Sequence, residues 1–334
     1  FIVTICVPPS RAEEKDLLAY WSFDEGTGAV VHDYSGHDFH LTIPGGAWTT
    51  GISGHALQFR GNVCPSLGEG FEDFFVFSGD YSVEAWVKHK EKASQIYVSK
   101  WTGAGASSAW WLGFFQNTVQ WAEYDEQSQV RLKGPDIADG QWHHVVGVRA
   151  ADKLSLFVDG RFAAEGPSPR KPAGANGAPV RIAGFGPGRV GSWAYSGLLD
   201  EIRIYGRALT AEEIQQRFAL ISSGKKSPTT SPIAAGLPAR VIVRVVTSEI
   251  VPSDSPGSLR LSLITNRSFS GDAVPIRFRI LDRQGNLVTE WETSVRPNTG
   301  CRIYTCSISL PDLAEGLYQL VASASGSEIT HPIE

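Results

Sequence analysis

Aromatic side chains are the residues of this chain whose type best suits ligand recognition. The sequence holds ten tryptophans, and aromatic rings stack on the apolar faces of sugar rings. Trp110 and Trp111 are neighbours on a predicted strand, so only one indole can point inward and we expect the other to be exposed. Arg131 and Arg189 could make bidentate contacts with an acidic sugar, although single arginines are more often solvated surface charges. These residues suggest a carbohydrate site.

No complete catalytic motif accompanies them. The sequence contains no Gly-x-Ser-x-Gly elbow, His-Glu-x-x-His pair, P-loop or dinucleotide fingerprint. The neighbours His143 and His144 face opposite sides of a predicted strand, so they cannot bind one metal ion together. We expect one of them to be packed and the other exposed.

Composition limits the class of protein. Of 334 residues, 42% are hydrophobic and 19% charged, with 35 glycines and 19 prolines, which favours turn-rich β structure. A net charge of −5 offers no basic surface for nucleic acid. No apolar run of about 18 residues is present, which argues against a transmembrane helix. Four cysteines are too scattered for a disulfide framework or a paired zinc site, and their disulfide state stays open: Cys6, Cys64, Cys301 and Cys306.

The first 15 residues are predicted to be a leader or an N-terminal extension. Methionine is absent, so Phe1 is not a translation start. The apolar run Phe1–Val7 followed by a polar stretch is typical of the end of a secretory signal with cleavage near Ala12. An edge strand of the folded protein explains the same residues equally well.

Residues 16–221 are predicted to form one large β-sandwich domain. Short apolar or alternating runs between turn residues indicate eleven strands in two sheets, at 18–23, 56–59, 81–88, 95–100, 109–115, 118–124, 129–132, 143–149, 153–158, 180–182 and 199–205. Asp159-Gly160 predicts a hairpin turn. Thr210 and Glu213 form a capping box, which predicts a closing helix near 211–219.

A linker and a smaller domain follow. Residues 222–237 are predicted to be a linker, because the stretch 222–232 is poor in apolar residues, has no periodicity and contains two prolines. Six alternating runs within 238–334 predict a small immunoglobulin-like or fibronectin-III-like β-sandwich, at 240–247, 258–265, 274–282, 287–295, 302–310 and 316–324. Gly285 is placed for the positive φ of a hairpin turn. The fold class is therefore all-β.

The larger domain resembles the LamG-like jelly rolls of the concanavalin A-like lectin and glucanase superfamily. Seven blocks carry the resemblance in order: Leu18–Gly28, Asp33–Gly36, Gly54–Phe59, Tyr81–Val87, Asp139–Val145, Leu156–Gly160 and Gly197–Tyr205. The resemblance implies a jelly-roll fold but does not fix a function, because this fold hosts lectins, adhesion modules and glycosidases.

The resemblance also divides the aromatic residues. Trp21, Trp86 and Trp142 match family positions and are expected in the core. The residues outside those positions form the predicted ligand surface, together with Arg131: Trp101, Trp110, Trp121, Trp193 and Tyr195. Packing against the second domain would explain these aromatics about as well.

A structural calcium ion is implied by the resemblance. Members of the superfamily often hold Ca²⁺ between the loop after the first strand and the last strand, and the matching carboxylates are Asp33 and Asp200, with Asp24 to complete the shell. The loop departs from the common family pattern after Gly36. The alternative is that Asp33 is an Asx-turn residue and Asp200 a strand-end cap.

Glycosidases of the same fold carry Glu-x-Asp-x-x-Glu on a strand, but here Ser128 stands in the third position after Glu123 and Asp125. Glycoside hydrolysis would then lack the carboxylic acid that protonates the leaving group. We therefore expect Glu123 and Asp125 to belong to a cluster of acidic residues on the surface at the strand end.

The sequence therefore predicts a noncatalytic carbohydrate-binding or adhesion protein, secreted or at the cell surface, with a glycan or an extracellular protein as its ligand. A structural or self-assembling protein and the ancillary part of a larger glycoside hydrolase are the alternatives.

Overall fold

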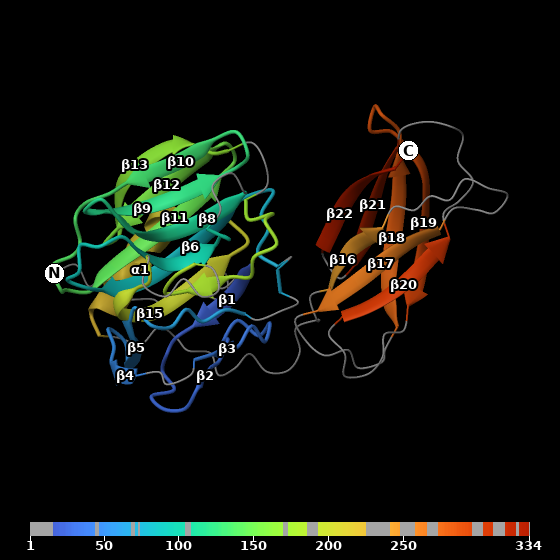
Figure 1. Cartoon of the computed structure of the whole chain (residues 1–334). Helices are drawn as coiled ribbons and strands as arrows, with labels where there is room; N and C mark the ends of the chain where they lie inside the picture. Colours follow the sequence, from blue (N-terminus) through green and yellow to red (C-terminus); the bar gives the residue numbers. More distant parts are fainter. Residues whose placement is uncertain are drawn as a thin grey trace, which may run out of the picture. The chain divides into compact units, whose positions relative to one another are not determined.

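The computed structural model of the chain describes residues 16–43, 47–67, 71–72, 74–103, 108–169, 173–185, 193–224, 241–247, 258–265, 273–295, 303–309, 318–324 and 327–333. The chain divides into two compact units, Phe1–Ala235 and Gly236–Glu334, which are both built mainly of strands (Figure 1). The predicted leader and residues 225–237 of the predicted linker lie outside the described residues. No helix among the described residues has the length and apolarity needed to cross a membrane.

The first unit is an antiparallel β-sandwich. Its eight-stranded sheet has the order β13-β12-β11-β6-β15-β5-β4, with β1 also paired to β15, and its five-stranded sheet has the order β10-β9-β8-β7-β14. β2 and β3 form a separate pair. The strand bounds are β1 Leu17–Trp21, β2 Val30–Val31, β3 Leu41–Thr42, β4 Ala47–Thr50, β5 His55–Arg60, β6 Tyr81–Lys88, β7 Gln95–Lys100, β8 Ala109–Phe115, β9 Thr118–Tyr124, β10 Gln129–Lys133, β11 His143–Ala150, β12 Lys153–Val158, β13 Arg161–Pro167, β14 Arg181–Ile182 and β15 Ser196–Tyr205.

Each of the eleven strands predicted in this unit overlaps an observed strand. Four strands were missed: β2, β3, β4 and β13. β13 is the edge strand of the larger sheet and is exposed or half-buried along its whole length. A strand with no buried face lacks the alternation of apolar and polar residues by which strands are recognised.

Large aromatic side chains fill the space between the two sheets. Trp121 of β9 packs against Tyr81 of β6, with ring centroids 5.7 Å apart, and against Trp110 of β8, 6.3 Å away. Gly147 on β11 makes room for this layer, because a Cβ there would lie 2.3 Å from a ring carbon of Trp121. The two sheets therefore interlock through Trp121.

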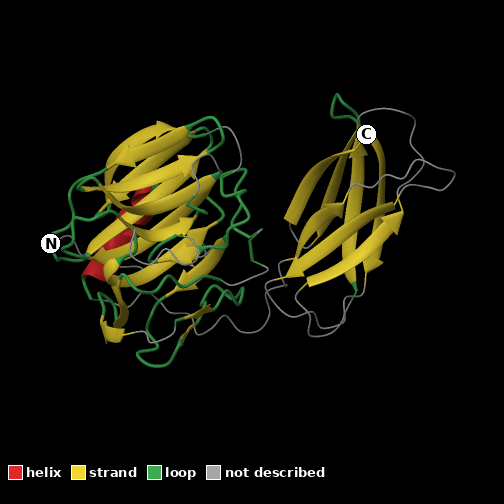
Figure 2. Ribbon diagram, in the orientation of Figure 1, coloured by secondary structure: helices red, strands yellow, loops and turns green. Residues whose placement is uncertain are grey.

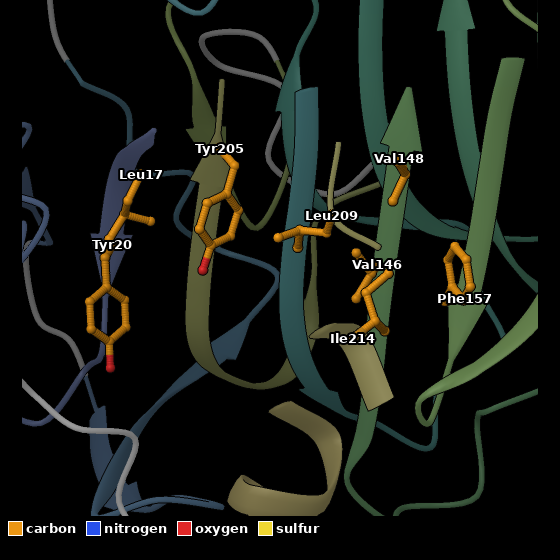
Figure 3. Packing of buried hydrophobic residues seen from close by; sticks show 8 residues of the cluster. All are labelled: Leu17, Tyr20, Val146, Val148, Phe157, Tyr205, Leu209 and Ile214. Atoms are coloured by element: carbon orange, nitrogen blue, oxygen red, sulfur yellow. The ribbon is translucent and has the colours of Figure 1, made fainter. Parts of the chain in front are cut away.

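The helix α1, Ala211–Ser222, covers the outer face of the eight-stranded sheet (Figure 2). Figure 3 shows the apolar cluster on this face, which joins β1, β11, β12 and β15 to Ile214 of the helix. The predicted capping box is confirmed: the Thr210 hydroxyl accepts a hydrogen bond from the Glu213 N–H, and the Glu213 carboxylate accepts one from the Thr210 N–H. Both contacts satisfy N–H groups at the helix start.

A buried charge cluster lies under the same helix. Glu84 of β6 has no exposed side-chain surface, and His144 Nε2 lies 3.1 Å from its Oε1. Arg203 of β15 lies 3.6 Å from Oε1, and Arg217 of α1 lies 3.9 Å from Oε2. Burial alone would raise the pKa of Glu84, but Arg217, the His144 hydrogen bond and Arg203 outweigh it and hold this pKa at about 2. These contacts tie the helix electrostatically to the central strands.

The second unit consists of two further antiparallel sheets, β16-β17-β20 and β19-β18-β21-β22. Their bounds are β16 Val241–Thr247, β17 Ser258–Thr265, β18 Val274–Leu281, β19 Leu287–Val295, β20 Ile303–Ser309, β21 Tyr318–Ala324 and β22 Ser327–Ile333. The first six match predicted runs and β22 was missed. On β18 the alternate residues Ile276, Phe278 and Ile280 are buried. The predicted hairpin turn is confirmed, with Gly285 at φ +84°.

The Glu84 cluster predicts a large loss of stability on truncation. Glu84→Ala should lower the free energy of unfolding by several kcal/mol, because the buried His144 and Arg203 and the half-buried Arg217 lose their anion. Glu165→Ala is the control, because its ion pair with Lys153 is exposed and should be worth less than about 1 kcal/mol. Urea unfolding measures both, and equal losses in the two variants would contradict the role given to Glu84.

Candidate functional site

The outer face of the five-stranded sheet carries a second aromatic cluster, opposite the side that packs on the larger sheet. On β8, Trp110 contacts Tyr81 and Trp121 between the sheets, whereas Trp111 contacts Trp101, Tyr124 and Trp193 on the other face. Both indoles are 0% exposed. The expectation that one of the two would be exposed is therefore wrong, because the outer face is covered as well.

Trp193 and Phe185 supply part of that cover. The Trp193 carbonyl accepts a hydrogen bond of 3.0 Å from Ile96 N–H on β7, which fixes the segment to the sheet. The Trp193 ring lies 4.8 Å from that of Phe115 and 5.9 Å from that of Phe185. Its φ of +67° is in the left-handed region, which is unfavourable for a bulky residue. Such a conformation persists only where the surroundings enforce it, and it often marks a functional position.

Arg131 of β10 completes the rim of this face. Its guanidinium carbon lies 5.2 Å from the ring centre of Tyr124, 5.4 Å from Phe115 and 5.7 Å from Trp111. Among the described residues Arg131 forms no ion pair, and it is half-buried. Phe115, Arg131 and Trp193 are the partly exposed members of the cluster, and we call these three residues the aromatic rim.

The other predicted ligand residues lie beneath the surface. Trp101, Trp110, Trp121 and Tyr195 are buried, so the prediction that they form an exposed surface is wrong for them. Tyr195 lies on a strand-to-strand connection, where its hydroxyl is 2.8 Å from the Leu198 carbonyl. These rings pack the interior of the domain instead of facing a ligand.

Two further aromatics also differ from expectation, and Arg189 lies outside the described residues. Trp142 was expected in the core but is half-buried, with the Lys88 ammonium 6.0 Å from its ring. Phe115 was not singled out from the sequence. Its position four residues after Trp111 on one strand places both rings on the same face, and this was the available signal.

The two histidines follow the expected alternation. His144 is fully buried and stacks on Trp86 with centroids 5.1 Å apart. His143 is partly exposed and lies 2.9 Å from Asp159 and 3.1 Å from Asp139. Hydrogen bonding to Asp159 raises the pKa of His143. Within the described part of the chain, neither ring belongs to a group of three or more His, Cys, Asp or Glu side chains that could hold a metal ion.

Asp33 organises a loop through hydrogen bonds of its own. Its Oδ1 accepts from the backbone N–H of Tyr20 and Ser35, both at 2.9 Å. Its Oδ2 accepts from Phe39 N–H at 3.0 Å and from the Ser35 hydroxyl at 2.8 Å. Both oxygens are thus used by the protein, which is the arrangement of the Asx-turn alternative.

Asp24 and Asp200 both contact the turn between β4 and β5. Asp24 Oδ1 accepts a hydrogen bond of 2.9 Å from His55 N–H, and Asp200 Oδ2 accepts from Ile52 and Ser53 N–H at 3.0 and 3.2 Å. Asp200 Oδ1 is buried and has no hydrogen-bond partner among the residues that the structure describes. Burial, helped by the charges of Glu201 and Asp24, raises the pKa of Asp200 well above its ordinary value. The pair therefore has an uncompensated buried oxygen.

Glycines at this turn allow the two carboxylates to approach. A Cβ on Gly51 would lie 2.3 Å from Asp200 Oδ2, and one on Gly54 would lie 1.9 Å from Asp24 Oδ1. Across the described residues, no group of three or more His, Cys, Asp or Glu side chains is arranged to hold a metal ion. Any cation held here would need backbone or water oxygens beside the two carboxylates.

Glu123 and Asp125 are not surface acids, contrary to expectation. Glu123 points between the sheets, where it accepts a hydrogen bond of 2.7 Å from the Tyr81 hydroxyl and pairs with Arg149 at 3.0 Å. Burial raises the pKa of Glu123 to about 7 against the opposing effects of Tyr81 and Arg149. Asp125 is also buried, and its Oδ1 accepts hydrogen bonds from Gln127 and Ser128. Glu123 therefore faces the core, away from the aromatic rim.

The fold agrees with comparisons to known proteins. Residues 71–215 match the family described as Laminin_G_3, the concanavalin A-like lectin/glucanases superfamily. The first unit thus contains a concanavalin A-like lectin/glucanase domain, as the sequence resemblance implied. No curated protein sequence matches the chain.

Solved structures show similarity in fold. The binding domain of Paraclostridial Mosquitocidal Protein 1 is 12% identical, with a TM-score of 0.51 over 93% of this chain and 76% of that chain. Domain 4 of AbnA, a GH43 extracellular arabinanase from Geobacillus stearothermophilus solved in complex with arabinotriose, is 21% identical, with a TM-score of 0.47 over 60% of this chain and 97% of that chain. The botulinum neurotoxin serotype D/C binding domain is 11% identical, with a TM-score of 0.48 over 94% and 87%.

The buried Glu123 predicts a pH dependence of stability. Because its pKa in the folded protein, about 7, lies above the ordinary value of 4.5, its contribution to stability is present below pH 4.5 and is lost as the pH rises to 7. The loss is of the order of 3 kcal/mol, since one pKa unit corresponds to about 1.4 kcal/mol.

Glu123→Gln cannot titrate and should lack this part of the pH dependence. Urea unfolding at pH 4.5, 6 and 8 gives the free energy of unfolding of wild type and variant, and the difference between the two should change with pH. A difference that is constant over this range would show that Glu123 titrates normally in the folded protein.

Proposed function

We propose that the first unit is a noncatalytic carbohydrate-binding module whose ligand stacks on the aromatic rim. The observation that carries the proposal is the guanidinium of Arg131 held beside three aromatic rings without a carboxylate partner among the described residues. Partly exposed rings offer an apolar surface to a sugar, and the guanidinium offers several N–H donors to its hydroxyl or carboxylate oxygens.

The rigidity of the rim supports this use. Trp193 is fixed by its backbone hydrogen bond to β7, and Phe115 and Arg131 are carried by strands. The rings beneath, including Trp111 and Tyr124, are buried and hold the upper layer in place. A surface that is already ordered loses little conformational entropy when a ligand binds.

The carboxylate geometry favours binding over catalysis. Glycoside hydrolysis needs two carboxyl groups on either side of the scissile bond. Glu123 is engaged with Tyr81 and Arg149 between the sheets, and Asp125 is occupied with its own turn. We therefore propose that the module presents no hydrolytic pair to a sugar on the aromatic rim.

For the second unit we propose an immunoglobulin-like sandwich that spaces or docks the first. Its three- and four-stranded antiparallel sheets, with β16 close to β21 and β22, support this fold. Leu287 and Val288 on its edge strand β19 are exposed neighbours, which favours a structural or assembly role as the second candidate function.

We also propose that Asp24 and Asp200 hold a calcium ion. The buried Asp200 Oδ1 without a hydrogen bond and the nearby Asp24 charge support a cation there. Calcium prefers carboxylate and carbonyl oxygens, and it would neutralise the two carboxylates beside the β4–β5 turn. The oxygens of Asp33 are already used, so this proposal leaves that residue out.

Substitution of the aromatic rim tests the carbohydrate proposal. A glycan array first identifies a ligand, and calorimetric titration then compares variants. Phe115→Ala, Trp193→Ala and Arg131→Gln should each weaken binding about tenfold or more, because a lost stacking or charge-assisted contact is worth about 1–2 kcal/mol.

Trp142→Ala is the matched control, since it removes a half-buried indole directly before β11 of the larger sheet and should leave the affinity unchanged. Folding of each variant is checked by circular dichroism. Unchanged affinity in Arg131→Gln and Phe115→Ala would refute the proposed site.

Thermal unfolding tests the calcium proposal. Adding calcium to chelator-treated protein should raise the Tm of the wild type, because an ion that binds only the folded state stabilises it. Asp200→Asn should abolish this increase. Asp33→Asn should lower the Tm by similar amounts with and without calcium, so the increase in Tm caused by calcium should remain. Loss of this increase in Asp33→Asn but not in Asp200→Asn would show that the ion lies elsewhere.

A further inference from the structure

A cavity of about 440 Å³ lies at one edge of the first unit, between the β12–β13 hairpin, the residues that end β10 and the helix α1. Its lining includes Lys133, Pro135, Arg161, Phe162 and Phe218. A pocket of this size lies within the range of small-ligand sites. None of these residues belongs to the aromatic rim or to the β4–β5 turn.

The cavity combines an exposed ring with a rigid wall. Phe162 is 61% exposed, the highest value among the large hydrophobic residues of the described chain. Its neighbour Phe157 contacts it edge-on at 5.8 Å. Phe218 is fixed by stacking on Trp86, with centroids 5.7 Å apart and planes 8° from parallel. The hairpin approaches Phe218 closely, because a Cβ on Gly160 would lie 3.1 Å from it.

Two cations border the exposed ring of Phe162. Lys133 and Arg161 are exposed, and neither forms an ion pair with any residue that the structure describes. The carboxylate lining the cavity, that of Asp159, is already engaged: Oδ2 lies 2.9 Å from His143 Nδ1, and Oδ1 accepts from His144 N–H at 2.9 Å. Although the chain has a net charge of −5, the cavity therefore has a local positive charge that can attract an anion.

We propose that this cavity is a second ligand site, which takes an anionic sugar. The carboxylate or sulfate group would lie between Lys133 and Arg161, and the apolar face of the ring would lie on Phe162. The combination of a flat exposed ring and two cations suits a sugar acid, which presents an apolar ring face and an anionic group together. Hexaglutamate tests the competing case of an acidic peptide, which would pair with the edge strand β13 through backbone hydrogen bonds. The site differs in its residues from the proposed carbohydrate site and goes beyond it.

Titration of the full chain with defined probes tests the inference. The probes are trigalacturonate, a sulfated chondroitin disaccharide, the neutral trisaccharide galactotriose and hexaglutamate. We expect the uronate, the sulfated sugar or both to bind, with an affinity that falls as salt increases. The two anionic sugars distinguish a carboxylate ligand from a sulfate ligand.

Substitutions locate the binding. Phe162→Ala and the double variant Lys133→Gln/Arg161→Gln should each weaken the anionic sugar about tenfold. Arg60→Gln removes an exposed arginine from β5, at the other side of the sheet, and serves as the control. Phe115→Ala should leave this binding unchanged, so failure of this site and failure of the aromatic rim can be distinguished.

Three results would overturn the inference. The first is that neither anionic sugar binds. The second is that galactotriose or hexaglutamate binds as tightly as the anionic sugars. The third is that both cavity variants bind the anionic sugar with unchanged affinity, as the control Arg60→Gln does.

Discussion

The need to cover both faces of the five-stranded sheet governs the structure of the first unit. Strand β8 carries Trp110 on one face and Trp111 on the other, and water must be excluded from both. The larger sheet covers the inner face through Tyr81 and Trp121. On the outer face Trp193, in a left-handed backbone conformation, packs over Trp111. The aromatic rim is the part of this outer aromatic cluster that stays partly exposed to solvent, and it is the proposed ligand surface.

Buried charges fix the opposite side of the sandwich. Glu84 draws together strands β6, β11 and β15 and the helix α1 through His144, Arg203 and Arg217. With that helix in place, Phe218 stands beside the β12–β13 hairpin and forms a wall of the edge cavity. The position of the helix, and with it the second proposed site, therefore depends on electrostatic contacts in the interior. Buried ion pairs of this kind are costly to break, which favours one defined arrangement.

Local patterns in the sequence predicted most strands, the Asp159-Gly160 hairpin and the capping box at Thr210, because these features depend on neighbours in the chain. Burial of particular aromatics was predicted poorly. Trp111 is covered by Trp193, more than 80 residues later, and Glu123 meets its partner Arg149 from the other sheet. Such contacts cannot be read from alternation along one strand. Asp200 was found through the family resemblance, but its contact with the turn at Ile52 and Ser53, almost 150 residues earlier, could not be predicted from a local pattern.

The most direct test of the central claim is a titration of the isotope-labelled chain with its glycan ligand, observed through the indole Nε1–H signals in a ¹H–¹⁵N NMR spectrum. Ten tryptophans give ten assignable reporters spread over both faces of the sandwich and the second unit. The account predicts that the signals of Trp193 and of Trp111 beneath it shift with ligand concentration, while those of Trp21, Trp86 and Trp142 do not. Shifts at Trp142 with none at Trp193 would contradict a ligand site on the aromatic rim.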